Sequence, residues 1–310
     1  MVRGSVAARL CLTPHGAGAI VIAQQISNGL ALGSIYAMIA VALTLSIGVI
    51  NFLNFSIPGV FMVSAFVVWI VMQLTGSWLF AFLLALLVGG CLALLVERFT
   101  WSWLNNVDPF VPLVSSMAFL MLFENWALTM WGSDLKTLPS ISAADVRIAG
   151  TVISLPQLAA LLISISLAVA LRFVLTQTPV GRALRTISED KEVASILGIN
   201  VNRTVRILFV VSALCAALAG ILFSVSYRQV HPFMGEIIGL RGISAMVIGG
   251  MGNVWGAIIG GILIGLGEVA AINVFGADFV DIVIYGTLLL ILTVKPEGLF
   301  GAPVSGRGRV

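Results

Sequence analysis

Long apolar runs alternate along this chain with short polar connections. An apolar helix needs about 20 residues to cross the hydrocarbon core of a bilayer, so the pattern predicts a series of membrane-spanning helices. We expect these helices at about residues 21–49, 52–73, 78–97, 111–131, 155–175, 205–227, 238–251, 254–273 and 280–295. Because the run at 238–251 is short, the pattern predicts eight or nine spans. The expected fold class is all-α, a polytopic membrane protein.

Composition supports this fold class. Hydrophobic residues make up 60% and charged residues 9% of the 310 residues, and the mean hydropathy is +1.12. Soluble domains average about 25% charged residues, so a soluble globular domain is excluded. Cys11, Cys91 and Cys215 are scattered, which indicates neither a disulfide framework nor a metal site. No basic run with interleaved aromatic residues points to nucleic acid.

One connection carries much of the positive charge. It holds six of the 16 Lys and Arg residues, namely Arg172, Arg182, Arg185, Lys191, Arg203 and Arg206. By the positive-inside rule this loop is cytoplasmic. Alternating spans then place residues 97–110 and the tail 302–310 inside, and residues 132–154 and the N-terminus outside. Residues 1–20 are expected to be a disordered extension of a membrane domain over 21–301, although Arg3 and Arg9 do not favour the outer side.

Within this loop the sequence predicts a short amphipathic helix. Ser188 is its expected N-cap, and Glu189 and Asp190 favour its positive end. Its apolar face is expected to hold Val193, Ile196 and Leu197, and Gly198 is expected to end it with a positive φ. Such a helix at the cytoplasmic surface predicts a docking partner.

Two polar, Gly- and Pro-containing segments interrupt the apolar pattern, at Asn51–Gly59 and at Gly249–Gly256. Backbone freed by Pro and Gly cannot face lipid, so such breaks occur where they are buried in protein or line a watery path. A pair of broken segments in the two halves of a chain indicates a transport pathway. We therefore predict broken helices that line a central path. For the nearby Gly256, Gly260 and Gly261 we favour close helix packing over contact with substrate.

Ionisable residues inside apolar runs must face a partner or a cavity. Glu124 and Arg241 are placed deep enough to belong to the pathway or to an ion pair. Glu268 lies late in its predicted span. Glu97 and Arg98 are expected to be interfacial anchors, and Asp278 and Asp281 are expected at the membrane surface.

Several short motifs occur together in a recognisable order. They are Asn28–Ala37, the break near Asn54 and Phe55, Glu97–Arg98, the loop from Gly181 to Asn200, the turn Gly249–Gly252 and the closing segment Pro296–Gly301. Together, over nearly all of residues 24–301, they resemble the branched-chain amino-acid type permeases of ABC importers. The resemblance implies that residues Glu189–Asn200 are a coupling helix that docks into a groove of an ATPase subunit.

The resemblance and the two breaks define the candidate site residues. Those expected to couple to the ATPase are Glu189, Asp190, Glu192, Ala194, Leu197, Gly198 and Ile199. Those expected along the translocation path are Asn54, Ser56, Pro58, Gly59, Glu124, Arg241, Gly250, Gly252 and Asn253.

The resemblance also implies partners. They are ABC ATPase subunits, a second permease that is either a sister or a second copy, a periplasmic solute-binding protein at the outward loops, and the lipid of the bacterial inner membrane. Lys136, Lys191 and Lys295 are the lysines of the chain and none follows Gly, so the nucleotide-binding motif G-x-x-x-x-G-K-[ST] is absent. The chain is therefore expected to be a non-enzymatic subunit without a cofactor or metal.

Two departures leave the solute open. Members of this family often have N-F-A-H-G-E at the first break, whereas Asn54–Gly59 lacks the histidine and the acid. The basic cluster that often follows the Glu-Arg pair is replaced here by Trp101, Trp103 and Asn105. Branched-chain amino acids, urea, short amides and aromatic or other carboxylates are all compatible with the resemblance. An ion-coupled secondary transporter that uses Glu124, and a scaffold subunit without a path, are the alternatives from other classes.

Overall fold

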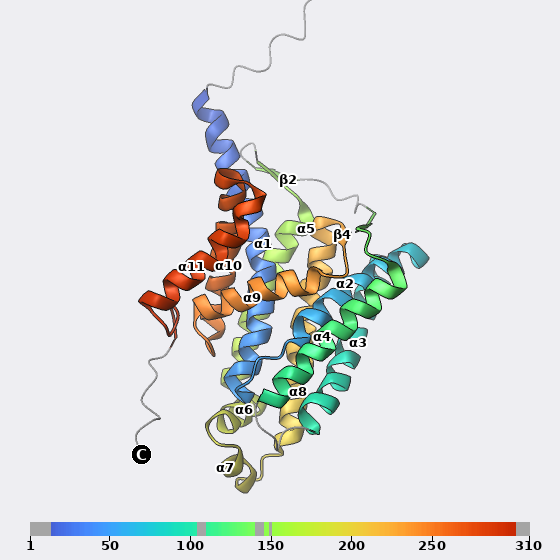
Figure 1. The fold of residues 1–310 in the computed structure, drawn as a ribbon, viewed down its shortest axis with the longest axis vertical. Coiled ribbons are helices and arrows are strands. Elements are labelled where there is room, and N and C mark those ends of the chain that lie inside the picture. The colour runs from blue at the N-terminus through green and yellow to red at the C-terminus, as the bar shows by residue number, and fades with distance from the viewer. Residues whose placement is uncertain (1–13, 104–109, 140–145, 149–150, 302–310) are drawn as a thin grey trace, which may run out of the picture.

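The computed structural model describes residues 14–103, 110–139, 146–148 and 151–301, and Figure 1 shows its helical architecture. The helices are α1 (Pro14–Ile50), α2 (Ser56–Thr75), α3 (Trp78–Val96), η1 (Glu97–Ser102), α4 (Phe110–Trp131), α5 (Leu155–Gln177), α6 (Pro179–Glu189), α7 (Lys191–Ile196), α8 (Val201–Tyr227), α9 (Met234–Gly249), α10 (Val254–Phe275), η2 (Ala277–Phe279) and α11 (Val280–Val294). The strands are β1 (Lys136–Thr137), β2 (Val146–Ile148), β3 (Thr151–Ile153) and β4 (Gln229–Val230). The all-α membrane fold is confirmed.

Eight stretches within the described residues are helical, long enough and apolar enough to span a membrane. The run predicted at 238–251 is not among them, because α9 has only 16 residues. Figure 1 shows α9 crossing the bundle obliquely to α1 and α8. One expectation for the N-terminus was wrong in part: residues 14–20 form the start of α1, and Pro14 suits the first position of a helix. Residues 1–13 and the predicted tail 302–310 lie outside the described residues.

The core is built around α1, which is almost completely buried from Ala31 to Leu45. Its most extensive contact is with α10, where small residues let the two backbones approach closely. A Cβ atom on Gly33 would lie 2.8 Å from the Cα atom of Ile262, and one on Gly261 would collide with the backbone of Ala37. Packing, the favoured interpretation of Gly261, is therefore confirmed.

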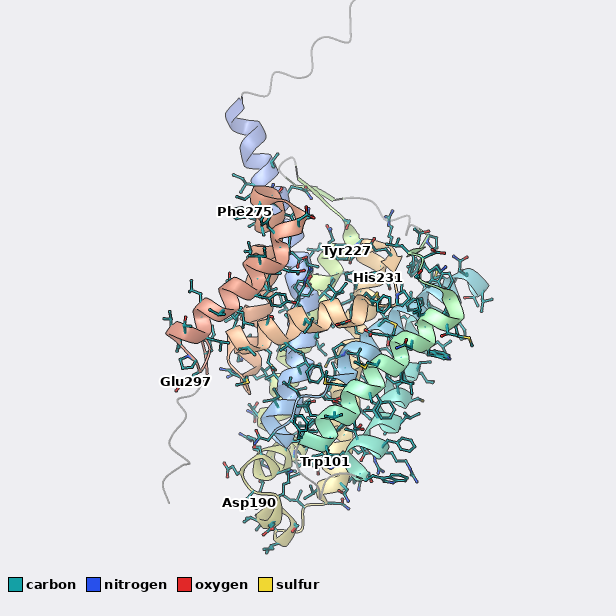
Figure 2. All side chains as sticks on the ribbon, viewed as in Figure 1. Trp101, Asp190, Tyr227, His231, Phe275 and Glu297 are labelled. Atoms are coloured by element: carbon teal, nitrogen blue, oxygen red, sulfur yellow. The ribbon has the colours of Figure 1, made fainter. Side chains whose placement is uncertain are left out.

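Helices α3, α4, α5 and α11 lie at the outside of the bundle and expose apolar side chains such as Leu83 and Leu289. In a membrane these faces meet lipid or another helix. The two ends of the bundle are distinct. Asp190 and Trp101 lie toward the end that carries α6 and α7, whereas Tyr227, His231 and Phe275 lie toward the opposite end (Figure 2). Strand β1 pairs with β4 at that opposite end, through Lys136 and Val230.

Candidate functional site

The charged loop folds as two short helices, α6 and α7, and this corrects the prediction of one helix capped by Ser188. The Ser188 hydroxyl donates to the carbonyl of Arg185 within α6. Asp190, whose backbone is extended, is the N-cap of α7, because its carboxylate accepts from the N–H groups of Glu192 at 2.8 Å and Val193 at 3.2 Å. An Asp in this position satisfies otherwise unpaired donors and favours the positive end of the helix.

The tip of α7 presents an uncovered apolar surface. Val193, Ile196 and Leu197 are exposed, with Ile196 at 83%, whereas Ala194 faces inward and is fully buried. Gly198 follows with φ of 81°, as predicted, and ends the unit in a conformation that favours glycine. Three exposed apolar side chains on a charged loop are a surface that a partner would cover.

The same unit contacts the first break through aromatic stacking. The Lys191 ammonium lies 4.6 Å from the centre of the Trp101 ring, and burial lowers the pKa of Lys191. Trp101 is buried and stacks on Phe52 with a centroid distance of 6.2 Å and an interplanar angle of 7°. Phe52 lies between α1 and α2, so three side chains connect α7 to the break.

At the first break, side chains replace missing helical hydrogen bonds. Asn54 Oδ1 accepts from the backbone N–H of Ser56 at 3.1 Å and from its hydroxyl at 2.7 Å, and both residues are buried. The N–H of Phe55 donates to Ser116 Oγ of α4 at 3.0 Å. Asn51 has φ of 60°, in the left-handed region that residues other than glycine rarely occupy.

Pro58 and Gly59 lie in the first turn of α2, between two other helices. A Cβ atom on Gly59 would lie 2.8 Å from Phe123 of α4, and one on Gly239 of α9 would collide with the Pro58 ring. The first break is therefore tightly packed on two sides.

The second break is held by the C-terminal segment, a contact that sequence analysis missed. The N–H groups of Leu299 and Phe300 donate to the carbonyls of Ile248 at 2.8 Å and Gly249 at 3.0 Å. Asn253 caps α10 by accepting from the N–H of Trp255 at 3.0 Å. Its amide also donates to the Phe300 carbonyl at 2.9 Å.

Glycine conformation shapes the same turn. Gly250 and Gly252 have φ of 109° and 84°, which other residues adopt only with strain.

The two breaks meet in space. A Cβ atom on Gly48, at the end of α1, would lie 3.4 Å from the Cα atom of Gly252. Between them lies an open cavity of about 630 Å³, lined by Asn51, Phe52 and Leu53 of the first break and by Met251 and Gly252 of the second. Segments about 200 residues apart in sequence thus share one cavity, near the end that carries α7.

Glu124 has a role that the sequence did not reveal. Its carboxylate accepts from the backbone N–H of Glu236 at 3.1 Å, in the first turn of α9, and the residue is buried. The four first N–H groups of a helix lack internal partners, and a negative charge is favourable there. Glu124 therefore stabilises the start of the oblique helix from α4.

Arg241 forms a buried cluster with a residue that the sequence analysis set aside. It pairs with Glu268, and its Nη1 donates to the Tyr36 hydroxyl at 2.9 Å. Tyr36 in turn donates to Glu268 Oε2 at 2.7 Å, and Arg241 Nη2 lies 3.5 Å from Asp281 Oδ1. Only Glu124 and Arg241 were expected to lie deep enough for an ion pair, and this was wrong for Glu268, because α10 packs on α1 and turns its carboxylate inward.

This cluster belongs to a second large cavity, of about 560 Å³, toward the end away from α7. It is lined by α1, α5, α8, α9, α10, β4 and the connection after β4, with residues that include Asn28, Leu32, Tyr36, Tyr227, His231, Ile238, Arg241, Glu268 and Val269. The predicted path residues thus lie in different places: Gly252 lines the first cavity, Arg241 lines this one, and Glu124 lies beside α9. Their common path remains a prediction.

Glu97 is buried in the protein and accepts from Arg206 Nε of α8 at 3.1 Å, whereas Arg98 is exposed. Their interfacial position in the membrane remains a prediction. The described residues contain no group of three or more His, Cys, Asp or Glu side chains that could hold a metal ion.

A helical membrane domain with two broken segments, a cavity toward each end and a charged, apolar-tipped loop is the arrangement expected of a membrane permease. A family model described as "Branched-chain amino acid transport system / permease component" matches residues 25–292. The chain therefore belongs to this family, as its motifs indicated, and is a multi-pass membrane protein.

Individual relatives support the same family assignment. The high-affinity branched-chain amino acid transport system permease protein BraD of Pseudomonas aeruginosa is 30% identical over 294 residues, covering 90% of this chain and 96% of the relative. LivH of Escherichia coli K12 is 29% identical with the same coverage. The D-allose transport system permease protein AlsC of E. coli K12 is 24% identical over 84% of this chain and 77% of its own length.

A solved structure supports the fold. It is described as a metal-chelate type ABC transporter in an inward-facing conformation, with a TM-score of 0.52 and 17% identity over 94% of this chain and 92% of that chain. At this identity the likeness concerns the fold alone.

Proposed function

We propose that this chain is the permease subunit of an ATP-driven importer that moves a branched-chain amino acid across the bacterial inner membrane. The relatives BraD and LivH are named for that transport and match this chain over nearly its whole length. The energy comes from separate ATPase subunits, because the chain lacks the Lys-containing phosphate-binding motif. A second permease, sister or identical, completes the membrane pathway.

The observation that carries the proposal is the exposed apolar tip of α7 together with its contact to the first break. Ile196 and Leu197 project from the end of the bundle as a surface for an ATPase groove. Lys191, in the same helix, contacts Trp101 and through it Phe52. Movement of the ATPase subunits would thereby move α7 against the break, which opens or closes the cavity between the two breaks.

The orientation of the chain in the membrane follows from the position of its positive charges. Arg182, Arg185 and Lys191 surround the α7 end, which the positive-inside rule assigns to the cytoplasm. The cavity around Arg241 then opens toward the periplasm, where a solute-binding protein delivers the substrate to the outward loops. The first break lacks the histidine and acid that are common in the family, so the solute is the part of the proposal that needs direct measurement.

Co-purification tests the ATPase partnership. The chain is expressed with its cognate ATPase subunits, and Ile196→Glu is compared with the wild type. A charge in the centre of an apolar interface is expensive to desolvate, so we expect at least about a tenfold loss of bound ATPase, equivalent to about 1.4 kcal/mol. Ser195→Glu, on the same helix, is the matched control. Full retention of ATPase by Ile196→Glu would contradict the docking assignment.

A further inference from the structure

We propose that the cavity around Arg241 is a binding site for a zwitterionic amino acid, in which Arg241 binds the carboxylate and Glu268 binds the ammonium group. The inference rests on the proposed function and adds a site within the permease itself. Helices α1, α5, α8, α9 and α10 and strand β4 contribute to its walls, and the cavity, at about 560 Å³, exceeds the volume of a single amino acid.

The charged groups are held at the cavity wall by a closed set of contacts. Arg241 and Glu268 pair directly, and the Tyr36 hydroxyl bridges them at 2.9 and 2.7 Å. Their side chains remain 15% and 8% exposed, so part of each faces the cavity. A buried ion pair is costly to assemble and is often found where it serves binding or specificity.

Arg241 retains unused hydrogen-bonding capacity. A guanidinium carries five N–H donors in a planar fork that matches a carboxylate. Nη1 donates hydrogen bonds to Tyr36 and Glu268, and Nη2 lies 3.5 Å from Asp281 Oδ1. The buried Nε has no hydrogen-bond partner among the described residues. A small turn of the side chain would offer Nε and Nη2 together to an incoming carboxylate.

Charge balance selects the ligand class. An anionic ligand would take Arg241 and leave the Glu268 carboxylate buried without a counter-ion, which is strongly unfavourable. A cationic ligand would take Glu268 and leave Arg241 with only the Asp281 carboxylate, at 3.5 Å. A zwitterion replaces both contacts at once and leaves each buried charge with a partner. His231 also lines the cavity, and burial lowers its pKa, which favours the neutral imidazole over a competing positive charge.

The remaining wall suits an aliphatic side chain. Leu32, Phe223, Ile238 and Val269 line the same cavity as the charged cluster. Apolar surface next to a carboxylate-binding fork is the arrangement that a branched-chain amino acid requires.

The test measures binding of radiolabelled leucine to the purified complex of this chain with its permease and ATPase partners, without the binding protein. Leucine methyl ester lacks the carboxylate charge and 4-methylpentanoate lacks the ammonium group. We expect unlabelled leucine to compete, and each analogue to compete at least tenfold more weakly. Equal competition by either analogue, or no leucine binding by the wild-type complex, would overturn the proposal.

Variants locate the site. Arg241→Gln and Glu268→Gln are expected to lose leucine binding, and Asp278→Asn, on the exposed η2 segment, is expected to keep it. Because Arg241→Gln removes a buried ion pair, Val269→Trp provides a second test: it fills the cavity and leaves the pair in place, and at least tenfold weaker binding is expected. Unchanged binding in a folded Val269→Trp complex would overturn the assignment.

Leucine uptake distinguishes failure of this binding site from failure of the proposed importer function. If ATP-dependent leucine uptake persists although no leucine binds to the permease complex, the binding site is rejected and the importer assignment stands. Absence of ATP-dependent uptake would reject the proposed function itself.

Discussion

The Lys191 ammonium lies 4.6 Å from the centre of the Trp101 ring, which joins the first residue of α7 to a buried aromatic stack. Through Trp101 the contact reaches Phe52, at the break between α1 and α2. A cation over a Trp ring contributes about 0.5–2 kcal/mol, depending on how far it is desolvated. The stack is therefore strong enough to influence how α7 and the first break move together.

The first prediction concerns this stack. Lys191→Met keeps most of the apolar stem and removes the charge, so we expect ATP hydrolysis by the assembled importer to continue while substrate-stimulated hydrolysis and uptake fall several-fold. The loss of about 1 kcal/mol of coupling corresponds to roughly a fivefold change. The measurement is the ratio of transported solute to hydrolysed ATP in proteoliposomes.

Lys191→Arg is the matched control, because a guanidinium also binds the face of a Trp ring. It should retain most of the coupling. Trp101→Phe should behave like Lys191→Met, since Phe offers a weaker ring face, and the double variant should be no worse than either single variant. Additive losses would show that the two residues act independently.

A second prediction uses the backbone of Gly198. Its φ of 81° strains a β-branched residue by about 1 kcal/mol or more, so Gly198→Val should distort the end of α7. We expect normal membrane insertion but reduced substrate-stimulated ATP hydrolysis. Gly198→Asn is the control, since Asn tolerates positive φ, and it should stay close to the wild type. Wild-type coupling in Gly198→Val would argue against docking through this unit.

Glu124 supports a third prediction. If its carboxylate only caps α9, Glu124→Gln should keep most transport, because the amide oxygen still accepts from the Glu236 N–H. Glu124→Leu removes the acceptor and should lower the unfolding free energy by about 1–2 kcal/mol. Thermal unfolding in detergent measures the second effect and solute uptake the first.

The ion-coupled alternative makes the opposite prediction for this residue. A carrier that loads a proton on Glu124 would lose accumulation in Glu124→Gln, and its uptake would follow an imposed proton gradient in the wild type. That pair of results would replace the capping role by a coupling role.

A fourth prediction concerns the cavity between the breaks. Single cysteines at Asn51 and Met251, which line it, should react with a small membrane-impermeant thiol reagent, because a solvated thiolate forms there. Nucleotide should change the reaction rate if the breaks move during transport. Cysteines at Leu83 and Leu289, on apolar outer faces, should stay unreactive.

The native Cys11, Cys91 and Cys215 would be replaced first, because a thiol that is exposed, as Cys91 is, would add background labelling. Equal labelling at all four positions, or none at Asn51 and Met251 in any nucleotide state, would place the pathway elsewhere.

The apolar pattern alone predicted most of the fold, because bilayer thickness fixes helix length and leaves little ambiguity. The short run at 238–251 was harder, since only tertiary packing shows that α9 crosses obliquely and starts at Met234. The N-cap of α7 was displaced by two residues because Ser188 and Asp190 are both good capping residues, and sequence does not say which backbone is extended.

Contacts between residues far apart in the chain could not be predicted from the sequence. Nothing near Glu124 indicates that it meets Glu236, and Arg241 and Glu268 lie on different helices. The motif at Pro296–Gly301 supported the resemblance, but its backbone contacts with Ile248 and Gly249 appear only in the fold. Such contacts depend on how helices cross, which a local pattern does not encode.

The central claim is that ATP hydrolysis by a partner drives transport through this chain, and reconstituted uptake tests it most directly. Proteoliposomes that hold the permease, the ATPase subunits and ATP, with the binding protein outside, should accumulate radiolabelled leucine, and ionophores that collapse proton and sodium gradients should leave this unchanged. Accumulation by the permease alone, driven by an ion gradient and independent of ATP, would contradict the account.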